Sequence, residues 1–307
     1  MYVVDTLSAM PAAARGGSAV ALGFFDGVHL GHRAVLDAAA DYAAAHSLTA
    51  AAFTFDLPIS STMKGKRLLS EEQKQARVAE QGIAEYMAPP FADFCALTPL
   101  AFVQDILCGC FGAKAVFCGE NFTFGARAAG NVAVLRELGA ACGMAVEVVP
   151  MRQYRGEAVS STRIRAALAE GDIPLANALL GAPYAIDWPV CHGQGLGKKL
   201  GAPTINQNYP AGTLQPCCGV YITRARIAGR WYAGATGLGG RPTVADEGAA
   251  ITCETYLPDF SGNLYGKAPL LEFHQYLGPT QKFDSLEELR ACIFGAAEKS
   301  KVFFGEK

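Results

Sequence analysis

The sequence predicts two domains, an α/β domain built on a parallel sheet and a small antiparallel β-barrel that ends in a helix. In the first half, short apolar runs alternate with alanine-rich segments of helical composition, an order typical of a parallel sheet covered on both faces. In the second half, glycine-containing turns separate β-type runs, as between antiparallel strands. A length of 307 residues also exceeds what one hydrophobic core usually accommodates. We expect the domains to span 1–182 and 183–307.

The first half contains a βαβ pattern that begins the parallel sheet. Apolar residues 19–22 and 50–55 predict two strands, and the alanine-rich residues 34–45 predict the helix between them. Ligands of such sheets bind beyond the carboxyl ends of the strands, so the residues that follow 19–22 are candidates for a site. Further helices are expected at 71–82, 99–107 and 132–143, and further strands at 115–118 and 145–149.

The second half becomes glycine-rich after residues 181–189. Turn residues at 228–229 and 261–263 separate β-type runs and favour antiparallel pairing. The expected strands are 219–227, 231–235, 251–257 and 270–277, and the expected final helix is 285–299.

Composition excludes several classes of protein. A net charge of -2 is not the basic footprint of a protein that binds nucleic acid or an acidic membrane surface. No apolar run reaches membrane-spanning length and no signal peptide is recognised, so we expect a cytoplasmic protein. The ten cysteines lack the spacing of a zinc site and are interpreted as reduced, mostly buried thiols.

Residues 23–32, with the sequence GFFDGVHLGH, are the most informative segment. They lie between a predicted strand and a predicted helix, where free backbone N–H groups and the helix dipole favour an anion. His29 and His32 can hydrogen-bond phosphate oxygens, and Gly31 between them lets a phosphate approach the backbone. The pattern indicates a nucleotide α-phosphate under attack. The alternative is a strand-to-helix turn with two incidental histidines.

This segment resembles the His-x-Gly-His signature of the nucleotidylyltransferase superfamily. Its longer form, Gly-x-Phe-Asp-Gly-Val-His-x-Gly-His, resembles the bifunctional bacterial riboflavin kinase/FAD synthetase family. The resemblance implies a Rossmann-like FMN adenylyltransferase domain at 1–182 and a riboflavin kinase domain at 183–307. It also implies that His29 and His32 stabilise the transition state, while nucleotide binding falls to Gly23, Phe25, Asp26 and Gly31.

Residues 119–125 resemble the Gly-x-Asn/Asp-Phe-x-Phe-Gly block of the same family. Phe122 and Phe124 could flank a flat isoalloxazine or adenine ring, and Asn121 could hydrogen-bond the flavin or nucleotide. The alternative is a strand end with core phenylalanines.

Residues 160–165 open a helical run and add phosphate-binding groups. Ser160, Ser161 and Thr162 can cap a helix and donate to phosphate. Arg165 offers a planar, permanently charged fork for the β- or γ-phosphate. A simple helix cap is the alternative interpretation.

The segment 193–206 is similar to the glycine-rich flap and Pro-Thr-x-Asn motif of riboflavin kinases, and it contains no Walker A loop. The resemblance implies that Thr204 and Asn206 help to hold Mg²⁺, whose preferred ligands are oxygens. It places Gly195, Gly197 and Lys198 near the phosphates. A glycine-rich β-turn is the alternative.

Residues 252–256, followed by Asp-Phe and Leu-Tyr-Gly-Lys, resemble the catalytic strand of the kinase family. By that resemblance Glu254 is the base that takes the proton from the ribityl 5′-hydroxyl, a role open to a carboxylate beside Mg²⁺-bound ATP. The alternative is an edge-strand glutamate that faces water.

Three places depart from the family pattern. Gly278-Pro279-Thr280 stands where the family shows an Arg-Pro-Glu-like stretch, which removes a basic contact expected near the flavin. Residues 53–58 lack the family's histidine, and Ala182 occupies a position that often carries arginine. These departures indicate a divergent member.

The expected function is ATP-dependent phosphorylation of riboflavin to FMN, followed by adenylylation of FMN to FAD with release of pyrophosphate. Riboflavin, FMN and ATP are the expected small-molecule substrates, with Mg²⁺ as cofactor and neither nucleic acid nor a membrane as partner. The alternatives are a divergent member with one activity, a monofunctional adenylyltransferase and a non-catalytic flavin-binding protein. A class I aminoacyl-tRNA synthetase also carries His-x-Gly-His, but the acidic balance argues against tRNA binding.

Overall fold

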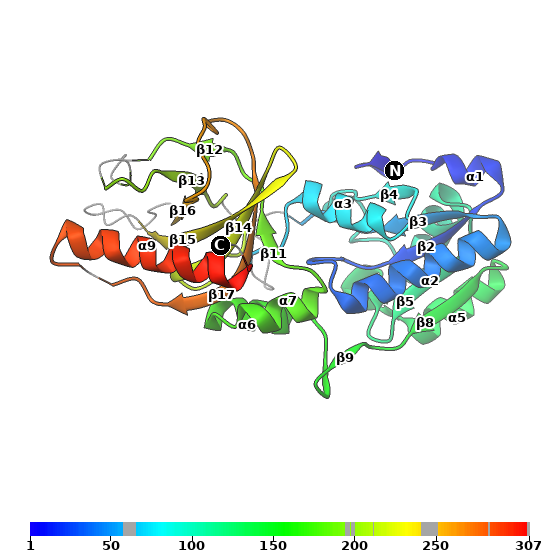
Figure 1. The fold of residues 1–307 in the computed structure, drawn as a ribbon. Coiled ribbons are helices and arrows are strands. Elements are labelled where there is room, and N and C mark those ends of the chain that lie inside the picture. Colours follow the sequence, from blue (N-terminus) through cyan, green and yellow to red (C-terminus); the bar gives the residue numbers. More distant parts are fainter. Residues whose placement is uncertain are drawn as a thin grey trace. The chain divides into compact units, whose positions relative to one another are not determined.

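The computed structural model describes residues 1–57, 66–193, 197, 200–210, 212–240, 251–281 and 283–305. The chain forms two compact units, Met1–Ser161 and Thr162–Lys307 (Figure 1). The division predicted at 182/183 differs from this boundary because α6 (Ser161–Glu170) and α7 (Ile173–Leu180) belong to the second unit, where α7 packs on strand β17 (Leu270–Gly278). As a division between activities, 182/183 stays a prediction.

The first unit is built on a parallel sheet, as predicted, and the sheet has six strands, of which four were expected. Its order is β1 (Tyr2–Val4), β4 (Glu85–Met87), β3 (Thr49–Phe53), β2 (Ser18–Leu22), β5 (Ala113–Gly119) and β8 (Ala145–Val149). Every neighbouring pair is parallel. The strand order reverses at β2 and β5, and a crevice forms beyond the carboxyl ends of strands at such a point.

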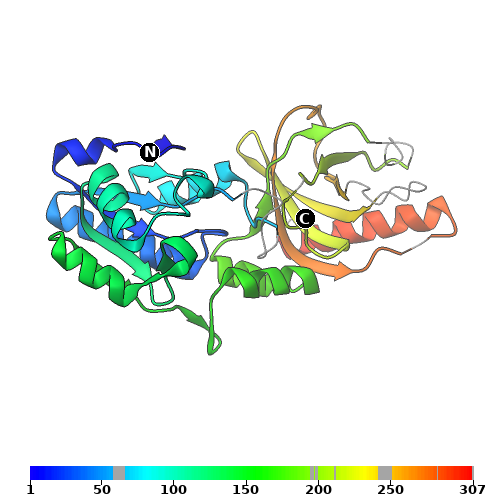
Figure 2. The same cartoon turned by 180° about the vertical axis from the view of Figure 1, so that it is seen from behind.

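Helical segments cover this sheet. Helix α2 (Leu30–His46) packs against β2, β3 and β5. Residues of the π-helical segment η3 (Phe102–Cys110) and of α5 (Val132–Ala141) form the core cluster with Val20 and Leu22. Figure 2 shows the unit from behind, with helices again in front of the strands. The remaining elements are α1 (Pro11–Arg15), α3 (Glu71–Glu80), α4 (Pro99–Ala101), η2 (Phe91–Asp93), η4 (Ala126–Ala128), and the hairpin strands β6 (Thr123–Phe124), β7 (Gly130–Asn131), β9 (Gln153–Tyr154) and β10 (Glu157–Ala158).

Helix α2 begins four residues before the predicted start at residue 34. The side chain of His29 occupies the N-cap position and accepts the backbone N–H of His32, so the helix can start at Leu30. Gly31 and His32 therefore lie in the first turn of the helix.

The second unit is a curled, seven-stranded antiparallel sheet with a terminal helix. The order is β11 (Tyr184–Ile186), β17, β14 (Gly219–Ile227), β15 (Arg230–Gly240), β16 (Ile251–Tyr256), β13 (Thr204–Asn208) and β12 (Val190–Cys191). Helix α9 (Leu286–Phe303), red in Figure 1, packs across β14 and β15. The predicted antiparallel architecture and final helix are confirmed.

A row of three buried threonines links the central strands of this sheet. The Thr236 hydroxyl lies 2.8 Å from the hydroxyl of Thr223 and 2.8 Å from that of Thr255. Thr223 also donates to the carbonyl of Gly234 at 3.0 Å. All three side chains are fully buried, so each hydroxyl depends on its neighbours for hydrogen bonds.

We expect Thr236→Val to lower the free energy of unfolding by about 1–3 kcal/mol, because it strips a partner from two buried hydroxyls. Thermal unfolding of the full chain measures the effect. The triple variant Thr223→Val/Thr236→Val/Thr255→Val removes the hydroxyls together and should recover much of the loss. If the triple variant loses more stability than the three single variants lose in total, the three hydroxyls do not form a linked row.

Candidate active sites

The first candidate site is the loop between β2 and α2. Phe25 and Val28 adopt positive φ values of 54° and 42°, which non-glycine residues seldom do. The buried Phe25 ring meets the imidazole of His32 edge-on, with centroids 5.5 Å apart. The Thr54 hydroxyl donates to the carbonyl of Phe24 at 2.9 Å. The loop is therefore held in a strained shape by its surroundings, as functional loops often are.

His29 and His32 stack at the start of α2, with ring centroids 3.6 Å apart. The Nδ1 atom of His29 accepts the backbone N–H of His32 at 3.2 Å, so the neutral His29 ring carries its proton on Nε2. That N–H is free to donate to an anion at the helix terminus. A Cβ on residue 31 would come within 3.2 Å of the His29 ring, so glycine is the residue that fits between the two histidines.

Burial keeps both imidazoles neutral. Desolvation lowers the pKa of His29 to about 4. Desolvation, followed by the charges of His29 and Lys74, lowers the pKa of His32 well below its ordinary value. The Nδ1 atom of His32 is buried without a hydrogen-bond partner among the described residues. The helix start thus presents neutral hydrogen-bond donors to a bound phosphate.

Asp26 ties this loop to two other segments. Its Oδ1 accepts the backbone N–H of Leu68 at 2.9 Å, and its carbonyl accepts the Ser161 hydroxyl at 2.9 Å. Asp26 is buried, and these bonds position the loop. Ser161 therefore adjoins the loop, as expected for a shared phosphate site.

The other predicted phosphate-binding residues of this group lie around the start of α6. Ser160 precedes the helix, while Thr162 and Arg165 lie within it, in the second unit. Their contacts with phosphate stay predictions.

An aromatic cavity of about 430 Å³ opens beside Gly23, the residue that follows β2. Phe122 and Phe124 line it and stack with centroids 5.8 Å apart, while their contact with a flat ligand stays a prediction. Asn121 is exposed and is not among the lining residues. The sequence did not reveal the other aromatic walls, which come from three separate segments: Phe53, Phe55, Phe91, Phe94 and Phe102. The cavity suits a flat aromatic ring.

Lys74, a buried lysine near this loop, was also not predicted from the sequence. Its Nζ lies 3.5 Å from Glu71 and 5.4 Å from the centre of the Phe24 ring. Burial lowers its pKa, an effect that Glu71 and Asp26 oppose. No motif marked it, because its burial arises from the packing of α3 against the loop.

The second candidate site depends on strand register. In the pairing of β13 with β16, Asn206 lies opposite Glu254 and Thr204 opposite Tyr256. Glu254 in turn lies opposite Gly237 of β15. Residues two apart share a face and opposite residues are neighbours, so Thr204, Asn206 and Glu254 gather on one face of the sheet.

Asn206 and the glycine-rich segment fit a site for a bound cation and phosphates. Asn206 is buried, and its Oδ1 has no hydrogen-bond partner among the described residues. A Cβ on Gly193 would come within 2.6 Å of the Asn206 amide. A Cβ on Gly197 would come within 2.4 Å of the Ala202 carbonyl, so both glycines permit a close approach of the chain. Gly195 and Lys198 lie outside the described residues.

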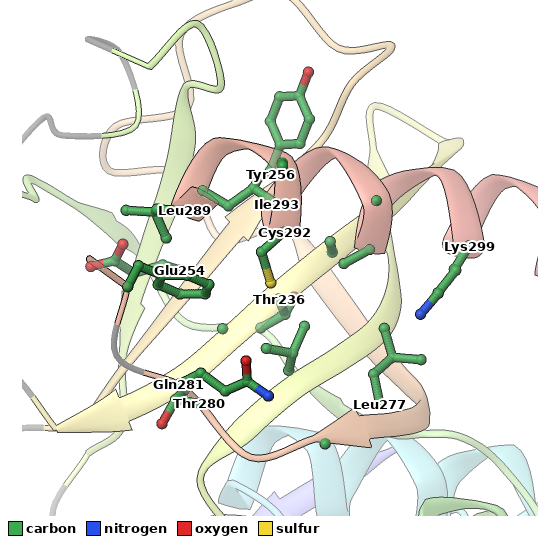
Figure 3. Close-up of a pocket in the computed structure, with 18 of the residues that line it drawn as sticks. Thr236, Glu254, Tyr256, Leu277, Thr280, Gln281, Leu289, Cys292, Ile293 and Lys299 are labelled. Carbon is green, nitrogen blue, oxygen red and sulfur yellow. The ribbon is translucent and has the colours of Figure 1, made fainter. Parts of the chain in front are cut away.

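A cavity of about 770 Å³ lies between this face and α9 (Figure 3). Glu254 stands at one side and Lys299 at the other, with Leu277 and Ile293 in the wall. Cys292 and Lys299 were not foreseen, because their lining role follows from the docking of α9. The divergent residues Gly278, Pro279 and Thr280 line the same cavity.

The part of the chain that the structure describes contains no group of three or more His, Cys, Asp and Glu side chains that could hold a metal ion. No helix in this part is long and apolar enough to cross a membrane.

The depressed pKa of His29 predicts a pH-dependent stability. The folded protein protonates His29 near pH 4 and the unfolded chain near pH 6.5, so between these values the unfolded chain binds more protons. The free energy of unfolding should therefore fall by about 3 kcal/mol as the pH drops from 6.5 to 4. Thermal unfolding at pH 7 and pH 5 measures the loss. His29→Asn keeps a capping side chain without this titration and should lose less. Equal losses of stability in the parent and in His29→Asn would contradict the assignment of this pH dependence to His29.

Comparison with known proteins assigns a family to each half of the chain. Residues 12–163 match the family model of FAD synthetase, and residues 180–304 match that of riboflavin kinase. A bifunctional riboflavin kinase/FMN adenylyltransferase from Listeria monocytogenes is 32% identical over 94% of this chain and 92% of its own. The enzymes of the same description from Pseudomonas fluorescens and Escherichia coli are 33% and 31% identical, covering 90% and 99% of this chain and 90% and 98% of their own.

The fold has a close counterpart among solved structures. A chain from Streptococcus pneumoniae, described as a macrolide-efflux protein, superposes with a TM-score of 0.85 at 24% identity and covers 97% of this chain and 98% of its own. That likeness concerns the fold alone. The two family matches and the relatives at more than 30% identity show that the chain belongs to the family of bifunctional riboflavin kinases/FMN adenylyltransferases, which are transferases.

Proposed function

We propose that this chain phosphorylates riboflavin to FMN with ATP and then adenylylates FMN to FAD, releasing pyrophosphate. The observation that carries the proposal is that each unit has a cavity beside a group of polar residues suited to phosphate. We assign adenylylation to residues 1–182 and phosphorylation to residues 183–307. Only Cys118 and Cys253 of the ten free cysteines are buried, so the expectation of mostly buried thiols is wrong. Free thiols accord with a cytoplasmic location, which we also propose.

In the kinase site, riboflavin occupies the cavity beneath α9 with its ribityl 5′-hydroxyl towards Glu254. Glu254 is exposed at the cavity edge, where it can take the hydroxyl proton as the oxygen attacks the γ-phosphorus of ATP and ADP leaves. Gly197 and the neighbouring Gly195 and Lys198 are assigned to the ATP phosphates. Such a transfer depends mainly on positioning and charge neutralisation.

Thr204 and Asn206 would hold Mg²⁺ in this site. The fit rests on the unpartnered Oδ1 of buried Asn206 and on the shared face of the two residues. Both supply neutral oxygen ligands, which suit a hard cation that keeps waters and phosphate oxygens in its shell. When bound, the ion neutralises charge on the ATP phosphates.

In the adenylyltransferase site, a phosphate oxygen of FMN attacks the α-phosphorus of ATP and pyrophosphate leaves. The Nε2–H of His29, the His32 ring and the N-terminus of α2 stabilise the charge that develops. Gly23, Phe25, Asp26 and Gly31 shape this loop. Ser160, Ser161, Thr162 and Arg165 are assigned to the leaving phosphates.

The flavin of the second step is assigned to the aromatic cavity. Gly23, which lines the cavity, begins the loop that precedes His29. Phe122 and Phe124 are the proposed stacking partners, and the exposed Asn121 is assigned to the outer edge of the ligand.

Product analysis with riboflavin, ATP and Mg²⁺ tests the two roles. The parent should form FMN and FAD. Glu254→Gln should lower phosphorylation about 10²–10⁴-fold through loss of a general base. His29→Ala should lower adenylylation about 10²–10³-fold while FMN still accumulates. If the parent forms only FMN, the protein is a kinase without adenylyltransferase activity. If riboflavin stays unmodified, a flavin-binding protein is favoured.

The metal assignment predicts that a substitution of Asn206 changes the Mg²⁺ requirement of phosphorylation but not that of adenylylation. Asn206→Ala should raise the Mg²⁺ concentration for half-maximal phosphorylation of riboflavin about tenfold, because one oxygen ligand is lost. Adenylylation of supplied FMN should keep its Mg²⁺ dependence. Asn208→Ala, on the same strand but exposed, is the matched control. An equal rise in both variants contradicts the role of Asn206.

A further inference from the structure

The aromatic cavity contains one cationic side chain among its described lining residues, Arg127. It lies in the turn of the β6–β7 hairpin, whereas Gly23 lines the cavity from the end of β2. Thr123 and Cys95 are the other polar side chains of the described wall, which phenylalanines dominate. Arg127 is therefore the strongest hydrogen-bond donor available to a ligand there.

The backbone of this turn is strained. Arg127 and Ala128 both have φ of 56°, in the left-handed region that favours glycine. Such a conformation persists where neighbouring contacts impose it, and it recurs at ligand-binding sites. Here the Ala126 N–H donates to the Leu97 carbonyl at 2.7 Å, and a Cβ on Gly125 would come within 3.0 Å of the Pro99 ring. These contacts hold the turn that carries Arg127.

The N–H groups of the Arg127 guanidinium are available to a ligand. Within the part of the chain that the structure describes, it forms no hydrogen bond or ion pair. A guanidinium carries five N–H donors in a planar fork and matches paired acceptors in one plane. A flat ligand whose edge carries two such acceptors fits this position.

The reaction geometry selects the part of FMN that reaches Arg127. The FMN phosphate must meet ATP at the start of α2, which adjoins the Gly23 side, so the isoalloxazine ring occupies the aromatic walls. Stacking satisfies the faces of the ring but leaves its carbonyl-bearing edge without donors once water is displaced. We propose that Arg127 hydrogen-bonds the pyrimidine-dione edge of the flavin and orients FMN for adenylylation. This inference rests on the proposed function of the aromatic cavity.

Steady-state adenylylation, with FMN and ATP supplied directly, tests the proposal. Arg127→Gly removes the guanidinium and relieves the backbone strain, and it should raise the KM for FMN at least tenfold. The KM for ATP and the rate of riboflavin phosphorylation should stay unchanged. Lumiflavin, which has the ring without the ribityl phosphate, should inhibit the parent competitively, with a Ki that rises by a similar factor in Arg127→Gly.

Arg155→Gly is the matched control. Arg155 is exposed, as Arg127 is, and also has a left-handed backbone, with φ of 55°, but it lies in the β9–β10 turn and outside the cavity wall. Its substitution should leave the KM for FMN and the Ki for lumiflavin as in the parent. Arg127→Lys, which keeps the charge but not the fork, should recover part of the FMN affinity.

Three outcomes would overturn the inference: an unchanged KM for FMN in Arg127→Gly, an equal rise in Arg155→Gly, or a rise for FMN without a rise in the lumiflavin Ki. The last would assign Arg127 to the phosphate. Phe122→Ala separates this failure from that of the proposed function. If it raises the KM for FMN while Arg127→Gly does not, the cavity holds the flavin and only the role of Arg127 is wrong. If both leave the KM unchanged, the cavity is not the flavin site.

Discussion

The hydrogen bond from the His32 backbone to the His29 ring is the interaction on which the first site depends. It starts α2 at Leu30 and fixes the ring of His29 with Nε2–H free. It also brings the two imidazoles into a stack, which a bare Gly31 permits. Because the stack is buried, the rings stay neutral, and they act as hydrogen-bond donors rather than as fixed positive charges.

The second site is organised by backbone pairing instead of by a helix terminus. Thr204 and Asn206 lie far from Glu254 in sequence, and the antiparallel register of β13 and β16 makes them neighbours. The same sheet carries a buried row of threonines on its central strands, which ties β14, β15 and β16 together. Rigid strands beneath a docked α9 hold the proposed base and metal ligands in one geometry.

Both sites combine an apolar cavity with a polar margin. A flavin has the same division, since a flat ring carries a chain that ends in a hydroxyl or phosphate. Aromatic walls in the first unit and mixed aliphatic and aromatic walls beneath α9 suit the ring, while histidines, hydroxyls and the glutamate suit the group that reacts. Lys299 and Arg127 add a single cation to the described wall of each cavity.

The local sequence pattern was sufficient to predict those features that depend on residues close together in the chain. The bounds of β8 and β14 were predicted to the residue, and the motif at 23–32 was correctly placed between a strand and a helix start, because alternation, turns and helix termini are local properties. Short or mixed strands such as β1, β4 and β13 were missed, since three to five residues carry little periodicity. Tertiary structure alone decided the cavity walls, the burial of Lys74 and the positions of Arg127 and Lys299. Those features arise where segments distant in sequence pack together, and packing of that kind leaves no periodic signal in the chain.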